Sequence, residues 1–320
     1  MYRDQFYFSI LIFSENSLEM TNTAHMKSNS LLDQIGNTPL VKLQNIIQKK
    51  GVELWVKLEG NNPGGSVKDR AAFNMVKSAL DRGDIDKNTK LIEATSGNTG
   101  IALAMIAQLF GLQIELVMTE SATKERVQTM RAYGAKVTLT SAENGILGAR
   151  DYAESKVKNE GNFMFNQFGN NDNWKAHYKT TGPEIWRDTE GKITHFVSAM
   201  GTTGTIMGTS TYLKEQNTSI KIIGTEPTEG SRIPGIRKWP KEYLPTIFDR
   251  SKIDDVIGVS ESEARAMCKK LAREEGVFCG MSAGGAVATA LKVANSIDQG
   301  IVVTIIPDRG DRYLSSDLFD

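Results

Sequence analysis

Short apolar runs alternate along the chain with longer segments in which apolar residues recur every three or four positions. A short continuous apolar run is typical of a buried strand, and the longer spacing is typical of an amphipathic helix. Regular alternation of the two predicts an α/β fold with doubly wound, mostly parallel sheets. The predicted strands include residues 91–94, 114–119, 136–140, 163–168, 195–200 and 301–307. The predicted helices include residues 71–80, 101–107, 124–133 and 146–159.

Three of the predicted strand-to-helix connections are rich in glycine and hydroxyl residues. They read TSGNTG (95–100), GTTGT (201–205) and MSAGG (281–285), the last before a helix predicted from Ala286. Free backbone N–H groups at a helix start, with hydroxyls beside them, can hold a phosphate or a carboxylate without a metal. The alternative is a tight turn in which glycine only relieves strain. Neither G-x-x-x-x-G-K-[ST] nor G-x-G-x-x-G occurs at these turns, which disfavours an ordinary ATPase or NAD enzyme.

Lys68 follows a glycine-containing stretch, NNPGGSV (61–67), and precedes a helical pattern. Ser66 with Asp69 three residues later predicts a capping box, which would place Lys68 in the first helical turn. There the helix dipole and partial burial both lower the lysine pKa, toward the neutral amine that can attack an aldehyde. The alternative is a solvated lysine near a helix cap.

Length and composition favour a two-domain protein that acts on small molecules. The 320 residues, of which 40% are hydrophobic, exceed one ordinary domain. Because 38 basic residues balance 38 acidic ones, nothing in the net charge favours nucleic acid or an anionic membrane. Cys268 and Cys279 are interpreted as reduced thiols. Neither forms a zinc-binding spacing with a histidine, so no metal is predicted.

We predict an N-terminal α/β domain at residues 38–170 and a C-terminal α/β domain at 171–320. Residues 28–37 are predicted to form an arm that packs on the C-terminal domain. Ligands bind at the carboxyl ends of strands in open α/β sheets, so the loops described above should face a cleft between the domains.

The first 27 residues are interpreted as a flexible N-terminal extension. Its apolar segment, residues 6–13, is too short to span a bilayer, and no cleavage pattern of small residues follows. Met20 or Met26 is a plausible alternative start.

Four motifs together resemble the fold-type II pyridoxal-phosphate enzymes of the cysteine synthase group. They are IGNTPLV (35–41), GSVKDR (65–70), TSGNTG (95–100) and GTTGT (201–205), and their order is preserved. Three further stretches, PGIRKWP (234–240), EYLP (242–245) and DRGDRYL (308–314), are most similar to the B-type branch of that group, the O-acetylserine sulfhydrylases B. The resemblance covers about residue 30 to the end.

The resemblance implies a role for each matched residue. Lys68 would bind pyridoxal 5′-phosphate as a Schiff base and later remove the substrate α-proton. The cofactor phosphate would be held by Gly201, Thr202, Thr203, Gly204 and Thr205. Asn98 would bind the 3′-oxygen of the cofactor ring, and Ser282 would face its pyridine nitrogen. The substrate α-carboxylate would be bound by Thr95, Ser96, Gly97, Thr99 and Gln167.

A serine opposite the pyridine nitrogen has a chemical consequence. A neutral hydroxyl does not keep the ring protonated as a carboxylate would, so the ring is a weaker electron sink. This favours expulsion of a β-leaving group over transamination or racemisation. The implied reaction is replacement of the acetoxy group of O-acetyl-L-serine by sulfide or thiosulfate, giving L-cysteine or S-sulfocysteine and acetate. The resemblance also implies a cytoplasmic homodimer.

Arg237 and Lys238 lie in a long proline- and glycine-containing stretch, residues 227–245. Two cations over the cleft would match the two negative charges of thiosulfate, and the alternative is two solvated charges.

Other activities remain open at this point: cystathionine β-synthase, serine/threonine dehydratase, O-phosphoserine sulfhydrylase, or a non-catalytic homologue that binds the cofactor for regulation. The presence of Lys68 argues against the last of these.

Overall fold

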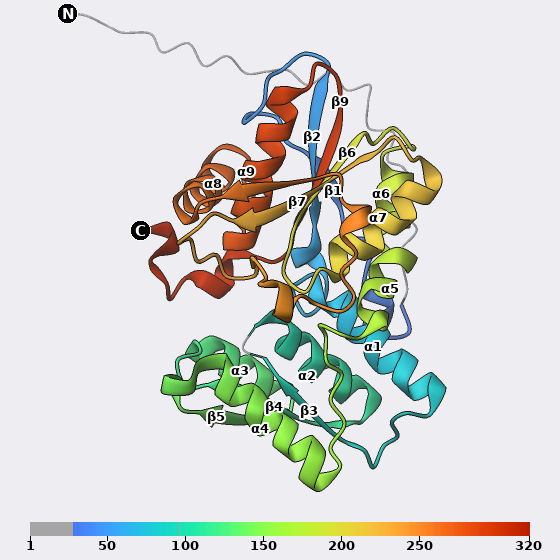
Figure 1. Cartoon of the computed structure of the whole chain (residues 1–320), viewed down its shortest axis with the longest axis vertical. Coiled ribbons are helices and arrows are strands. Elements are labelled where there is room, and N and C mark those ends of the chain that lie inside the picture. The colour runs from blue at the N-terminus through green and yellow to red at the C-terminus, as the bar shows by residue number, and fades with distance from the viewer. Residues whose placement is uncertain (1–27, 96) are drawn as a thin grey trace, which may run out of the picture.

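The computed structural model describes residues 28–95 and 97–320, and within these ranges it contains two β-sheets (Figure 1). The strands are β1 (Leu40–Lys42), β2 (Val52–Leu58), β3 (Lys90–Ala94), β4 (Gln113–Thr119), β5 (Lys136–Thr140), β6 (His195–Ala199), β7 (Lys221–Pro227), β8 (Asp255–Val259) and β9 (Gly300–Ile306). The helices are α1 (Lys68–Arg82), α2 (Asn98–Phe110), α3 (Lys124–Ala132), α4 (Gly145–Glu160), α5 (Asn171–Lys179), α6 (Thr181–Asp188), α7 (Gly204–Gln216), α8 (Glu261–Glu274) and α9 (Met281–Ser296). The predicted N-terminal extension, with Met20 and Met26, lies outside the described residues.

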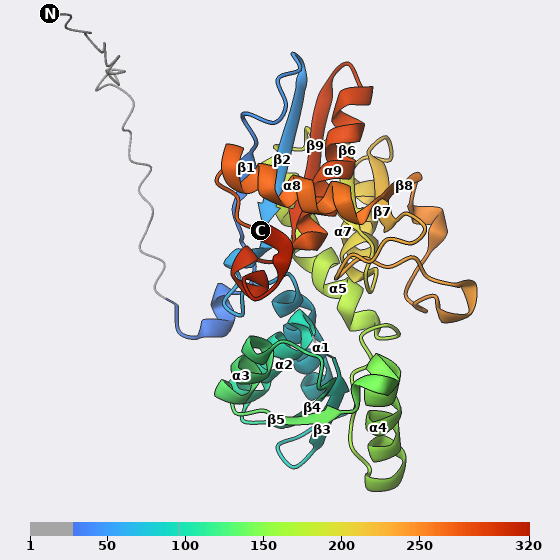
Figure 2. The same ribbon diagram turned by 90° about the vertical axis from the view of Figure 1, so that its left-hand side faces the viewer.

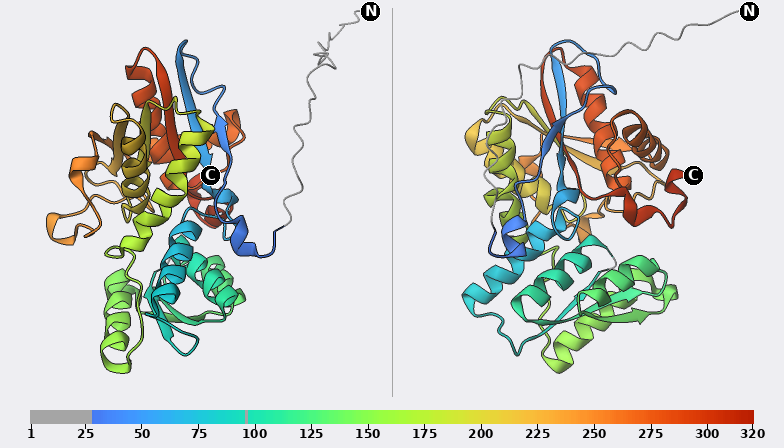
Figure 3. Two further views of the ribbon diagram at one scale, coloured as in Figure 1. Left: turned by 90° about the vertical axis from the view of Figure 1, so that its right-hand side faces the viewer. Right: turned by 180° about the vertical axis from the view of Figure 1, so that it is seen from behind.

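The larger sheet has the strand order β1-β2-β9-β6-β7-β8. All neighbours are parallel except β1 and β2, which are antiparallel. Helices α8 and α9 pack on one face, and α6 and α7 contribute to the core on the other (Figures 1 and 3). A parallel sheet covered on both faces needs strands that are apolar nearly throughout, and β9 satisfies this with GIVVTII.

The smaller sheet has the order β3-β4-β5, and all its strands are parallel. Helices α1, α2 and α3 share one apolar core with β3 and β4. Helix α4 packs its alanines against the opposite face of the sheet (Figure 2). The alternating strands and helices predicted from the apolar pattern are therefore confirmed for this part of the chain.

The structure contradicts the prediction that the N-terminal domain begins at residue 38. Strands β1 and β2 belong to the larger sheet, because β2 pairs along its whole length with β9, from Val52 opposite Gly300 to Leu58 opposite Ile306. The predicted arm is also placed differently. Its side chains Leu32 and Ile35 pack against the core of the smaller sheet rather than that of the larger one.

One predicted strand, 163–168, is wrong. Only Phe163 pairs with a strand, as an isolated parallel bridge to Leu91. The chain then turns at Asn166, whose φ is +52°.

Among the described residues, no helix is long and apolar enough to cross a membrane.

Candidate active site

A cavity of about 300 Å³ is lined by loops from both sheets. The smaller sheet contributes the connection between β3 and α2, and the larger sheet contributes the connection between β6 and α7 and the start of α9. Most of the predicted site residues line this cavity: Lys68, Thr95, Gly97, Asn98, Thr99, Gln167, Gly201, Thr202, Thr203, Thr205, Arg237 and Ser282. Gly204 and Lys238 do not line it, and Ser96 lies outside the described residues.

Lys68 is the first residue of α1. The predicted capping box is not formed, because the Asp69 carboxylate turns back to accept the Gly64 N–H at 2.5 Å. Val67 is the N-cap residue, and the Ser66 hydroxyl accepts the Lys68 N–H at 3.2 Å. Removal from water lowers the pKa of the Lys68 ammonium, against the charges of Asp308 and Glu59. The lysine is thus shifted toward its nucleophilic form.

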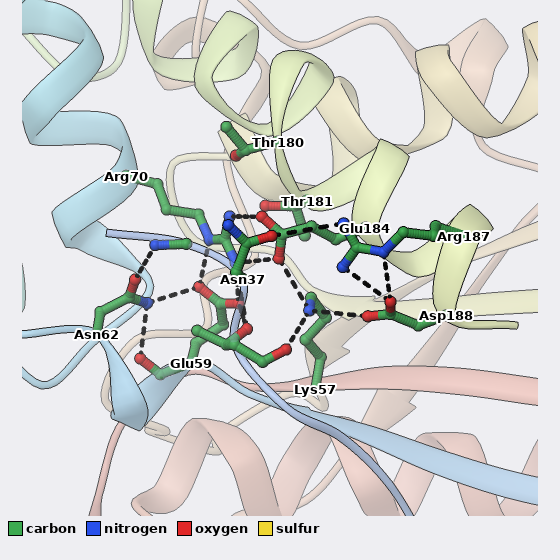
Figure 4. A network of polar contacts seen from close by, with 12 residues as sticks. Asn37, Lys57, Glu59, Asn62, Arg70, Thr180, Thr181, Glu184, Arg187 and Asp188 are labelled. Atoms are coloured by element: carbon green, nitrogen blue, oxygen red, sulfur yellow. Dashed lines mark hydrogen bonds and ion pairs between the residues drawn. The ribbon is translucent and has the colours of Figure 1, made fainter. Parts of the chain in front are cut away.

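Arg70, two residues after Lys68, fixes this end of α1 in a buried network of charges (Figure 4). Its guanidinium lies 2.7 Å from Glu59 and 2.6 Å from Glu184, and Lys57 lies 2.9 Å from Glu184. Burial alone raises the pKa of Glu59, but the charge and hydrogen bonds of Arg70 outweigh it and lower the pKa to about 2. Each charge is therefore paired, which is the condition under which buried charges are tolerated.

The loop before α7 is built for close approach to an anion. Thr203 has a φ of +70°, and its buried hydroxyl oxygen has no hydrogen-bond partner within the described part of the chain. A side chain at Gly201 would bring Cβ to 2.7 Å from the Gly235 carbonyl oxygen, and one at Gly204 would collide with Asn173. The first N–H groups of α7 and an unpaired hydroxyl therefore converge where only glycine leaves room.

His177 on α5 contacts this loop through the hydroxyl of Thr205. Its imidazole contacts the Thr205 hydroxyl at 3.3 Å and the Thr181 hydroxyl at 2.9 Å. Burial, helped by the charge of Arg70, lowers the pKa of His177 to about 3. The imidazole of His177 is thus a neutral hydrogen-bonding partner and not an acid–base group.

The second anion loop lies at the start of α2. The Thr99 hydroxyl donates to the side-chain oxygen of Gln167 at 2.8 Å, which places both residues at the same end of the cavity. The Asn173 amide donates to the backbone oxygen of Gln167 at 2.7 Å and to the Thr202 hydroxyl at 3.2 Å. This amide therefore connects Gln167, which itself contacts Thr99, to the loop before α7.

Asn98 is engaged by groups that the sequence reasoning did not assign. Its amide N–H₂ donates to Asp308 at 2.7 Å, and Arg312 donates to its oxygen at 2.5 Å. The Tyr313 hydroxyl also donates to Asp308, at 2.8 Å. Burial raises the pKa of the Asp308 carboxyl, against the hydrogen bonds from Asn98 and Tyr313. The DRGDRYL motif pointed to this segment, but not to its contact with Asn98.

Helix α9 begins at Met281, five residues before the predicted start at Ala286, so Ser282 lies in its first turn. The side chain is 5% exposed and borders the cavity. Among the described residues that line this cavity, none is acidic, while Lys68, Arg126 and Arg237 are basic. The hydroxyl of Ser282 thus faces a cavity without carboxylates.

Arg237 and Lys238 do not act as a pair. Arg237 lines the cavity, and its guanidinium lies 5.4 Å from the centre of the Trp239 ring. Lys238 instead lies 3.5 Å from Glu226 and borders a second, outer cavity of about 1000 Å³. The expectation that both cations face the cleft is wrong for Lys238, because its ammonium is directed to the Glu226 carboxylate.

Comparison with known proteins identifies the family. A family model described as pyridoxal-phosphate dependent enzyme matches residues 31–308. The chain belongs to this family. It is 55% identical over 292 residues to cysteine synthase B of Pseudomonas aeruginosa, covering 91% of this chain and 97% of that protein. It is 56% identical over 292 residues to cysteine synthase B of Escherichia coli, covering 91% of this chain and 96% of that one.

Solved structures of pyridoxal-phosphate enzymes of this family support the same conclusion. The cysteine synthase of Entamoeba histolytica superposes with a TM-score of 0.88 at 37% identity, covering 92% of each chain. The predicted fold-type II architecture and the resemblance to the cysteine synthase group are confirmed.

Proposed function

We propose that the protein is a cysteine synthase, which replaces the acetoxy group of O-acetyl-L-serine by a sulfur nucleophile. The observation that carries this proposal is the position of Lys68. Its amine is removed from water and lines the same cavity as the 95–99 and 201–205 loops, both of which are suited to binding anions. The cysteine synthases B with 55% and 56% identity support the same activity.

The residues present fit pyridoxal phosphate. The unpaired Thr203 hydroxyl and the α7 N–H groups suit its phosphate, and Lys68 suits its aldehyde. When bound, the cofactor supplies an electron-withdrawing ring that acidifies the substrate α-proton. Lys68, whose pKa is lowered by burial, would be the base that accepts this proton.

The α-carboxylate of the substrate is assigned to Thr95, Ser96, Gly97, Thr99 and Gln167. The Thr99–Gln167 hydrogen bond holds two of these side chains together before substrate arrives. Ser282 is assigned to the pyridine nitrogen, and the absence of acidic residues among the described lining favours elimination of a leaving group over chemistry that needs a protonated ring. The proposal includes a homodimer in the cytoplasm, as the resemblance implies.

The test is to add O-acetyl-L-serine and O-phospho-L-serine separately to purified, cofactor-loaded protein. With O-acetyl-L-serine we expect a change in the visible absorbance of the cofactor together with release of one acetate per site. Acetate release should become continuous once sulfide is added. A response to O-phospho-L-serine alone would instead identify a phosphoserine-using sulfhydrylase. Cofactor absorbance without any response to either substrate would identify a non-catalytic homologue.

Thiosulfate as a second sulfur donor is part of the proposal, and Arg237 is assigned to it. Charge-assisted hydrogen bonds contribute about 1.5–3 kcal/mol, so Arg237→Ala should lower kcat/KM for thiosulfate by roughly 10- to 100-fold. The kcat/KM for sulfide should change little, because sulfide has no oxygens to bind. Lys238→Ala is the matched control, since its ammonium pairs with Glu226 outside the inner cavity. Equal losses with both donors would show that Arg237 acts on loop closure.

A further inference from the structure

Glu93 is a buried carboxylate that none of the steps above uses. It lies on β3, two residues before Thr95, and is 4% exposed. No Lys, Arg or His of the described residues lies within ion-pair distance of it. Burial raises its pKa to about 7, against hydrogen bonds from backbone N–H groups. A buried carboxylate without a counter-ion is costly unless its oxygens are well hydrogen-bonded.

The partners of Glu93 lie on the segment that follows Phe163. Phe163 itself is bound to the edge of β3 by backbone hydrogen bonds of 2.9 Å, to Lys90 and from Ile92. Beyond it, the Glu93 carboxylate accepts the N–H groups of Phe165 at 3.1 Å and Asn166 at 3.3 Å. The side chain thus replaces the strand backbone as the acceptor at the point where the chain leaves the sheet.

The bound segment is the turn that presents Gln167 to the cavity. Asn166 has a φ of +52°, and its carbonyl accepts the N–H groups of Gly169 and Asn170, both at 3.0 Å. Gln167 emerges from this turn next to the Thr99 hydroxyl, at 2.8 Å. Glu93 therefore ties the turn to the same strand that leads into the Thr95–Thr99 loop.

We propose that Glu93 is a positioning residue for the substrate-carboxylate subsite, holding the 165–167 turn so that Gln167 and the 95–99 loop act on one anion. The proposal rests on the proposed function of that subsite. Both N–H groups donate to the same carboxylate oxygen, Oε2. A carboxylate suits this task because a charged oxygen accepts stronger hydrogen bonds than the neutral oxygen of an amide.

The test compares Glu93→Gln with wild type in two measurements. The KM for O-acetyl-L-serine should rise about 10-fold or more while kcat stays within about twofold, since binding and not chemistry is affected. The affinity for L-serine, which has the carboxylate but not the leaving group, should fall by a similar factor. Cofactor absorbance should be unchanged. Glu93→Asp keeps the charge but withdraws its oxygens by one methylene, and it should shift both quantities in the same direction.

Glu115→Gln is the matched control. This carboxylate lies on the neighbouring strand β4 and pairs with Lys136 at 2.9 Å, so its loss should leave KM unchanged. A double variant decides the mechanism: once Gln167→Ala has removed the amide, Glu93→Gln should add little to KM. An equal rise in KM in both backgrounds, or unchanged L-serine affinity in Glu93→Gln, would overturn the proposal. If wild type ignores O-acetyl-L-serine, the proposed function fails, while L-serine binding still tests Glu93.

Discussion

Lys68→Ala should abolish turnover and remove the absorbance near the boundary of the visible and ultraviolet that a lysine-bound pyridoxal phosphate gives. The proposal gives this side chain two roles, as the nitrogen that would bind the cofactor aldehyde and as the base that would take the α-proton. A positioned base alone contributes about 10²–10⁴-fold, so a loss of at least that size is expected. Steady-state kinetics and an absorbance spectrum of the purified variant measure both effects.

The matched control for this substitution is Lys77→Ala on the same helix. Lys77 is exposed and pairs with Asp81 one turn further along α1, at 2.9 Å. Exposed pairs of this kind contribute about 0.3–0.5 kcal/mol, so kinetics and absorbance should match wild type. Wild-type β-replacement in Lys68→Ala would contradict the assignment of this lysine.

Gly204→Asp should expel the cofactor. The new side chain would collide with Asn173 and place a carboxylate at the start of α7, where the phosphate is assigned. Two like unit charges about 4 Å apart repel by about 4 kcal/mol at an effective dielectric constant of 20. Because about 1.4 kcal/mol is tenfold in affinity, cofactor binding should weaken by roughly 10³-fold. Titration of the cofactor-free protein with pyridoxal phosphate gives the dissociation constant.

Two controls separate loss of the site from loss of the fold. Thr218→Asp adds the same charge in the exposed turn just beyond the other end of α7, and it should keep wild-type affinity. Thermal unfolding of cofactor-free Gly204→Asp reports whether α7 still packs. Full occupancy of Gly204→Asp at ordinary cofactor concentration would show that this loop does not hold the phosphate.

The local pattern predicted much of the fold because each helix and strand buries its own apolar face. Strand β5 matches its predicted range, 136–140, and all five predicted helices form, although the last begins earlier than predicted. The partner of a strand is not encoded locally. Residues 52–58 fall within the predicted N-terminal domain, yet they form β2, which lies between β1 and β9 in the larger sheet. The 163–168 run is apolar for a different reason, since Phe165 packs into the core of the smaller sheet from a turn.

The candidate site was predictable where a motif combines glycine with hydroxyls at a helix start. Those residues share a cavity because both loops lie at the carboxyl ends of strands. Contacts between distant side chains were not predictable. Asp308 meets Asn98 across 210 residues, and Lys238 turns to Glu226 because of the local course of the loop. Glu93 carries no sequence signal beyond being a charged residue in an apolar strand.

The pairing of β2 with β9 also determines the order in which the two sheets can fold during synthesis. Strands β3–β5 and their helices are contiguous in sequence, so the smaller sheet has all its residues early. Strand β2 must wait for residues 300–306, which a ribosome adding about 5–20 residues per second makes long after it has made β2. Until β9 has been made, the larger sheet, which carries Ser282 and the loop before α7, lacks a central strand. Assembly of the proposed cofactor site therefore has to follow synthesis of β9, and the cofactor cannot serve as an early template for folding.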